Sequence, residues 1–227
     1  MASEVSICNL ALGYLGDSAR VSSINPPEGS AQSQHCARFY PIARNALLEM
    51  FAWTFATTRA ALVQVDNSWS EWQFAYAAPN NIVDMLAVLP SDALSDTETT
   101  VPTSADYPFQ QGYMPMQAPV SYTPQPYAVE IDATTGNQII LTNVLDAVLR
   151  YVKLISDPNS FSPLFQVALS WLLASMLAGP LIKGDAGAAE SKRCAEMFRV
   201  WYAQATEADG DHGKQNVQPA VPWIAGR

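Results

Sequence analysis

The spacing of apolar residues predicts helices at both ends of the chain. Ser3 is a residue type that caps helices, and the apolar stripe that follows it stops at Gly16. A second helix is predicted from about Ser30, a third over 158–182, and a fourth after a cap at Asp185. The residues expected on the buried faces of the first, second and fourth helices are Ile7, Cys8, Ala11, Leu12, Leu15, Cys36, Phe39, Ala43, Leu47, Phe51, Cys194, Met197, Phe198, Trp201 and Ala205.

The segment 158–182 carries no formal charge, so a membrane span has to be weighed against a buried core helix. Gln166 and Ser170 interrupt the apolar run, and Pro163 and Pro180 lie near its ends. A membrane helix is usually framed by basic flanking residues and by an aromatic belt at each interface, and this segment has neither. We therefore predict a buried core helix and no membrane partner.

Residues 61–158 have a different pattern, in which short apolar runs alternate with turn formers. YAVEID and QIILT flank ATTGN, which predicts a β-hairpin. In its first strand, Val129 and Ile131 alternate with Glu130 and Asp132, so the two pairs face opposite sides. The later run RYVKLIS fits either a third strand or a helix.

These patterns together predict a mainly α protein, a helical bundle with an inserted β-hairpin or small sheet. Residues 1–60 and 159–208 form the bundle as one domain, and residues 61–158 form the β- and loop-rich insertion. The insertion includes a long loop, a Pro-rich arm at 91–126. Turn formers and prolines predict an extended C-terminal tail over 209–227.

The net charge of −9 is unevenly distributed along the chain. No Lys or Arg lies between Arg59 and Arg150, an interval that contains ten acidic residues. Such a segment repels phosphate backbones, which excludes a surface that grips nucleic acid, and a solvated acidic face is its simplest interpretation. The ten residues are Asp66, Glu71, Asp84, Asp92, Asp96, Glu98, Asp106, Glu130, Asp132 and Asp146.

Candidate chemistry is sparse. The three cysteines fit no zinc or redox spacing, which favours buried thiols in a reduced cytosolic setting. His35 and His212 have no partner at a metal-ligand or triad spacing. Glu130 and Asp132 have the residue types of a glycosidase pair, but solvation on a hairpin explains them equally well. We predict no enzyme activity, no cofactor and no metal.

Two aromatic segments point to packing and docking. Phe51, Trp53 and Phe55 alternate with small residues directly after the second predicted helix, which favours a rigid junction against the late apolar helix. The predicted tail ends in an apolar and basic group typical of interface centres, which we expect to dock on a partner. Its candidate docking residues are Val221, Trp223, Ile224 and Arg227.

The order of these motifs resembles the head-to-tail adaptors of short-tailed bacteriophages, also called tail tubular proteins A or head-completion connectors. The matching segments include ICNLALGYLG, WQFAYAAPNN, SFSPLFQVALSWLLASMLAGPL and WIAGR, and only the Pro-rich arm at 91–126 has no counterpart. The N-terminal part of the resemblance rests on Asn9, Leu10, Ala11, Leu12, Leu15, Gly16, Cys36, Arg44, Leu47, Leu48, Trp53, Phe55 and Ala56.

The resemblance implies a structural virion protein in the neck of the particle, assembled in the host cytoplasm. Its partners would be the portal protein, the tail nozzle protein and other copies of itself in a ring, twelve-fold in relatives, with tail fibres as a further candidate. The genome would pass through the ring without specific binding, along an acidic surface that could include Glu130 and Asp132. Two other classes stay open: a virion-associated cell-wall hydrolase, and an assembly or chaperone module that enters no ring.

Overall fold

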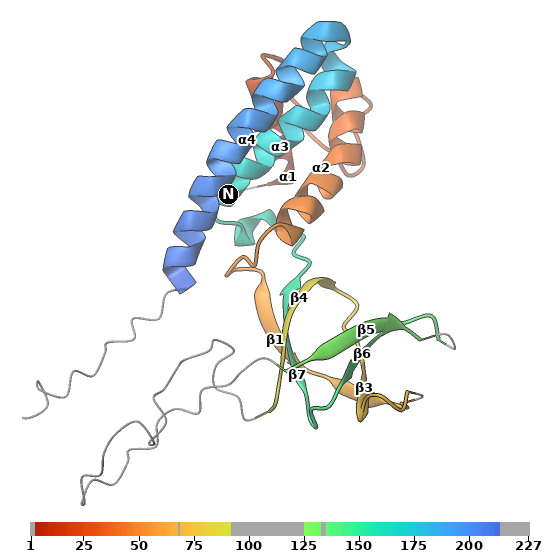
Figure 1. Ribbon diagram of the computed structural model, residues 1–227. Helices are drawn as coiled ribbons and strands as arrows, with labels where there is room; N and C mark the ends of the chain where they lie inside the picture. The colour runs from red at the N-terminus through yellow and green to blue at the C-terminus, as the bar shows by residue number, and fades with distance from the viewer. Residues whose placement is uncertain (1–2, 68, 92–124, 133–134, 214–227) are drawn as a thin grey trace, which may run out of the picture. The chain divides into compact units, whose positions relative to one another are not determined.

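The computed structural model describes residues 3–67, 69–91, 125–132 and 135–213. The chain divides into two compact units (Figure 1). The first, which we call the helical unit, comprises Met1–Phe55 and Ile155–Arg227, and the second, the β unit, comprises Ala56–Leu154.

The fold is α+β, so the prediction of a mainly α protein is wrong. Of the described residues, 47% are helical and 23% are in strands, and the strands form two antiparallel sheets of seven strands in total. The predicted hairpin is present, but four strands that precede it in the sequence were not predicted. Three of those strands have five residues or fewer, and β1, β3 and β4 each pair with a strand that lies far away in the chain, so local patterns do not reveal them.

Four helices build the helical unit in its described residues: α1 (Glu4–Tyr14), α2 (Ala31–Glu49), α3 (Pro163–Ile182) and α4 (Gly184–Gly213). A serine caps the N-terminus of each of the first three, with its hydroxyl accepting a backbone N–H of the first turn. The short 3-10 turn η2 (Pro158–Ser160) precedes α3. The capping serines are Ser3, Ser30 and Ser162.

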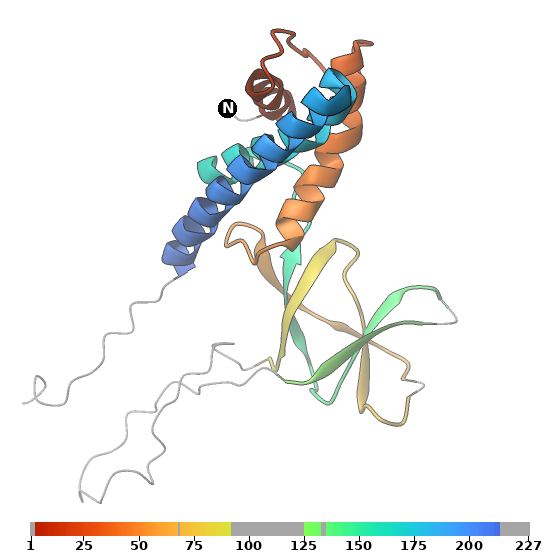
Figure 2. The ribbon, with the colours of Figure 1, turned by 45° about the horizontal axis from the view of Figure 1, so that its top comes forward.

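The central element of this unit is α3, which contacts α1, α2 and α4 (Figures 1 and 2). Its length and mean hydropathy of 1.7 are sufficient for a membrane span, but half of the apolar window is buried inside the protein. Ala168, Leu169, Leu173 and Leu177 are fully buried, which is the packing of a core helix.

The last helix differs from its prediction at both ends. It begins at Gly184, so Asp185 lies in its first turn rather than at its cap. It continues to Gly213, so residues 209–213 are helical and the prediction of extended chain is wrong for them. Residues 214–227, which include the four candidate docking residues, lie outside the described part of the chain.

The β unit contains two sheets, ordered β1-β7-β4 and β2-β3-β6-β5, with every neighbouring pair antiparallel. The predicted hairpin is confirmed as β5 and β6, and RYVKLIS contributes a strand, β7, rather than a helix. The strands are β1 (Thr57–Ala61), β2 (Val63–Val65), β3 (Phe74–Ala77), β4 (Ile82–Leu89), β5 (Tyr127–Ile131), β6 (Gln138–Thr142) and β7 (Val148–Lys153).

The two sheets form a small, partly open barrel (Figure 2). Only Leu62 separates β1 from β2, so one bent strand continues from the first sheet into the second. At the other side the Gln125 N–H donates to the Val88 carbonyl (3.2 Å), which joins β4 to the chain just before β5. The core inside this barrel draws on both sheets and includes Tyr76, Val88, Ile140, Val144, Ala147, Leu149 and Tyr151.

The Pro-rich arm predicted at 91–126 connects β4 to β5. Residues 92–124 lie outside the described part of the chain, so its predicted extended structure stays a prediction.

Candidate functional site

The aromatic segment after α2 packs within the helical unit. Trp53 is fully buried and meets the Phe165 ring of α3 edge to face, with 4.9 Å between ring centroids. Phe55 contacts the same ring at 5.1 Å, and Phe51 contacts Trp53 at 5.1 Å. Tyr202 of α4 contacts Trp53 from a further side at 6.3 Å. One indole therefore lies among aromatic rings from three parts of the unit, a rigid arrangement because such rings have few rotatable bonds.

Trp53 also completes the end of α2. Its indole Nε1–H donates to the Leu47 carbonyl at 2.8 Å. Leu47 is among the last four residues of α2, whose carbonyls have no partner within the helix. The side chain thus supplies a donor at a place that water does not reach, since both residues are fully buried.

Asp209 joins the far end of α4 to the same region. Its carboxylate accepts the Thr54 backbone N–H and the Thr54 hydroxyl, both at 2.8 Å. Asp209 is only 4% exposed, and the two donors compensate for the lost hydration of its charge. Residue 209 is therefore part of the packed helical unit and not of a tail.

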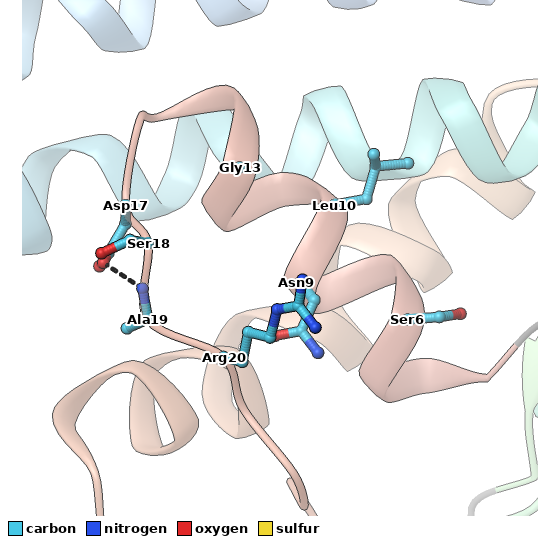
Figure 3. A pocket seen from close by; sticks show the side chains of 8 residues that line it. All are labelled: Ser6, Asn9, Leu10, Gly13, Asp17, Ser18, Ala19 and Arg20. Carbon is cyan, nitrogen blue, oxygen red and sulfur yellow. Dashed lines mark hydrogen bonds between the residues drawn. The ribbon is translucent and has the colours of Figure 1, made fainter.

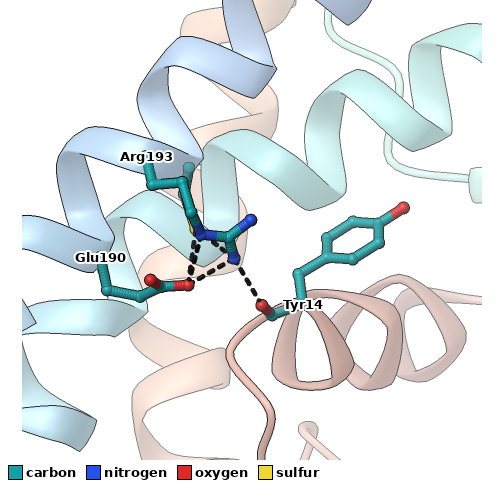
Figure 4. A network of polar contacts seen from close by, with 4 residues as sticks. Tyr14, Glu190 and Arg193 are labelled. Atoms are coloured by element: carbon teal, nitrogen blue, oxygen red, sulfur yellow. Dashed lines mark hydrogen bonds and ion pairs between the residues drawn. The ribbon is translucent and has the colours of Figure 1, made fainter.

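A second polar network connects α4 to the end of α1 (Figure 4). Arg193 of α4 forms an ion pair with Glu190 and donates through Nη2 to the Tyr14 carbonyl at 2.9 Å. That carbonyl belongs to the last turn of α1, so the arginine caps a helix C-terminus from another helix. The guanidinium also lies 5.5 Å from the Trp171 ring, on which the Tyr14 ring stacks at 3.7 Å.

Polar and thiol groups are buried together between α1 and α2. The Cys8 thiol is hydrogen-bonded with Cys36, which raises the pKa of Cys8 and lowers the pKa of Cys36. Burial, followed by the charge of Glu4, raises the pKa of Tyr40, whose buried hydroxyl has no hydrogen-bond partner among the described atoms. The Arg44 Nη1 lies 4.0 Å from a Glu4 oxygen. The thiols are fully buried, as predicted for small apolar side chains.

An open depression of about 640 Å³ lies beside α1 (Figure 3). Asn9 shapes it, since its amide donates to the Val21 carbonyl (2.9 Å) and accepts the Val21 N–H (2.7 Å). Asp17 accepts the Ala19 N–H at 2.8 Å in the loop that forms the rim. These contacts hold the loop beside α1 in place.

A cleft of about 390 Å³ opens in the β unit between β4 and β5. Within the described residues no ladder pairs 82–86 with β5, and the Val88–Gln125 bridge joins β4 to the chain just before β5. The Tyr127 hydroxyl reaches across and donates to the Met85 carbonyl at 3.0 Å. Burial, together with the charge of Asp84, raises the pKa of Tyr127, so this hydroxyl stays a donor. The lining residues are Ile82, Val83, Asp84, Met85, Tyr127, Val129 and Gln138.

The candidate carboxylates have different surroundings. Glu130 is exposed on β5, whereas Asp132 organises the hairpin turn by accepting the Thr135 N–H at 3.2 Å and by a short bond with its hydroxyl. His35 is half-buried beside Phe39. Among the residues that the structure describes, no three His, Cys, Asp or Glu side chains are grouped to hold a metal ion.

Sequence reasoning did not identify Asp209, Arg193 or the cleft. The sequence carried no specific signal for the first two, because their partners Thr54 and Tyr14 lie 155 and 179 positions away. The cleft follows from the course of two strands, of which β4 was not predicted.

Comparison with protein-family models finds no match for this chain, and comparison with curated proteins finds none either.

Proposed function

We propose that the chain is a structural virion protein, a head-to-tail adaptor that forms a ring beneath the portal. It joins the capsid to the tail nozzle, and the genome passes through the ring without specific binding. The observation that carries this proposal is the place of the residues on which the family resemblance rests. Ala11, Leu12, Cys36, Leu47, Leu48 and Trp53 all belong to the fully buried core of the helical unit.

Two further members of the motif have defined backbone roles. Asn9 holds the loop after α1 through Val21, and Gly16 adopts a φ of +74°, which a side chain would strain. The motif therefore specifies the packing of a helical unit, and a likeness in it supports a shared architecture. Stiff packing suits a subunit that carries mechanical load in a ring.

The charge of the β unit agrees with a neighbouring DNA channel. Residues 56–154 contain three basic and ten acidic residues, hence a net charge of −7. A surface of this sign repels phosphate, so a DNA polymer slides past it rather than binding.

The proposal is tested by electron microscopy of the purified chain mixed with portal. We expect rings on the portal with the full chain and fewer with a chain truncated after Gly213, which keeps all of α4. Rings that are absent with the full chain would contradict the proposal. Peptidoglycan zymography examines the hydrolase alternative, with Glu130→Gln and Asp132→Asn as variants. A robust turnover that these variants abolish in a folded protein would favour the enzyme.

A further inference from the structure

The barrel core of the β unit is incomplete along the β4–β5 cleft. Tyr127, Val129 and Ile131 share one face of β5, and Tyr127 packs on the barrel core. The alternation therefore points Val129 and Ile131 to the same side. Exposure nevertheless rises along the strand, to 38% for Val129 and 72% for Ile131. The sequence pattern predicted a common face for this pair, and the structure leaves that face uncovered because β4 is not paired with β5 there.

The cleft also presents two strand edges. Among the described residues, β4 is paired with β7 and β5 with β6, each on one side only over residues 82–86 and 127–131, and on the open edge of β4 the Met85 carbonyl already accepts the Tyr127 hydroxyl. Unpaired backbone groups on such edges accept an added strand, and alternate side chains of that strand enter the pockets beside it. An extended segment with a large apolar side chain would complete both the ladder and the core.

The charge of the cleft selects among possible segments. Asp84 in its lining and Glu130 beside it are exposed, and no Lys or Arg lines it. Residues 214–227 of this chain contain Lys214 and Arg227 and no acidic residue. Their last part, WIAGR at 223–227, is free of proline and has five residues, as many as β5.

We propose that residues 223–227 of a second copy add as a strand in the β4–β5 cleft. Trp223 covers Val129 and the apolar lining, and Arg227 meets the acidic rim. The tail of each copy and the cleft of the next form a head-to-tail contact, which repeats around a ring that closes. The choice of a second copy rests on the proposed ring, whereas the fit of segment to cleft does not.

The experiment measures binding of a fluorescein-labelled peptide of residues 214–227 to the full chain carrying Trp223→Ala. This substitution weakens the competition of the receptor's own residues 214–227 for the cleft. We expect saturable anisotropy that Val129→Lys, added to this receptor, reduces at least about tenfold. The matched control is Val63→Lys, the same change at a strand position that is 71% exposed and outside the cleft lining. The control should leave the affinity unchanged, and a peptide with Trp223→Ala should bind weakly.

Three results would overturn the inference: no saturable binding, equal loss in both lysine variants, or a wild-type chain that stays monomeric and excludes the peptide. The last result would mean that each tail fills the cleft of its own chain. Portal is absent from this assay, so the two proposals fail separately. Rings on portal without cleft-dependent peptide binding would refute only the tail contact, and peptide binding without rings would refute only the adaptor function.

Discussion

Replacing Trp53 should destabilise the helical unit more than any other single aromatic change. The side chain is fully buried among Phe51, Phe55, Phe165 and Tyr202, so Trp53→Ala leaves a cavity that neighbouring rings fill poorly. Buried Phe or Trp replaced by Ala costs about 3–5 kcal/mol of unfolding free energy. The Leu47 carbonyl also loses its donor in a place without water, so we expect about 4–5 kcal/mol.

The conservative variant Trp53→Phe separates the two contributions. It keeps most of the ring volume and removes the Nε1 donor, so we expect a loss of about 1–2 kcal/mol. The assay is equilibrium denaturation followed by far-ultraviolet circular dichroism, which reports mainly on the helices. Trp69→Ala is the control, since this side chain is 51% exposed in a loop of the β unit, and we expect less than about 0.5 kcal/mol.

A Trp53→Ala variant within about 1 kcal/mol of wild type would refute the reasoning. It would show that the rings around the indole rearrange freely and that the junction is not rigid. A Trp53→Phe variant as stable as wild type would refute only the role of the indole hydrogen bond.

Three other predictions concern polar contacts. Asp209→Ala removes the carboxylate that accepts both the backbone N–H and the hydroxyl of Thr54, so it should cost about 2 kcal/mol in the same denaturation assay. The control Glu207→Ala changes an exposed residue of the same helix and should cost little. A lysine at position 193 cannot keep both the ion pair with Glu190 and the hydrogen bond to the Tyr14 carbonyl. Because the Arg193 side chain is 49% exposed, thermal denaturation of Arg193→Lys should show a loss of only about 1 kcal/mol, and the control Lys192→Arg should show no loss. Hydrogen bonds from Ser22, and to a smaller extent from Ser30, hold the pKa of Glu28 below its usual 4.5. The stability that these bonds give to the folded state is therefore present above pH 4.5 and is lost as the pH falls through the lower pKa of the folded state. An NMR titration of Glu28 that gave a pKa at or above 4.5 would contradict this prediction. Glu28→Gln should remove this contribution to the pH dependence of stability.

Local sequence determined the elements whose signals lie within a few residues of one another. The α1 helix begins after Ser3 because that hydroxyl and the Ser6 N–H are three residues apart, and Gly16 follows its end in a left-handed conformation. The hairpin was predictable for the same reason, since Asp132 and Gly136 form its turn within five positions. In such elements the chain pays little entropy to bring the partners together, so local chemistry decides the outcome.

Only the tertiary structure decided the contacts between distant residues. β1 exists because Thr57 pairs with Val152, and neither the sequence TTRAA nor its spacing indicates a strand. Asp209 is buried because Thr54 lies against it, although its own surroundings in the sequence are those of a polar tail. Ile131 is exposed because β4 is not paired with β5 there, whereas its alternation in the sequence determines only that it shares a face with Val129. Burial and pairing are properties of the neighbours that folding brings near, and a pattern of residue types along one segment does not contain them.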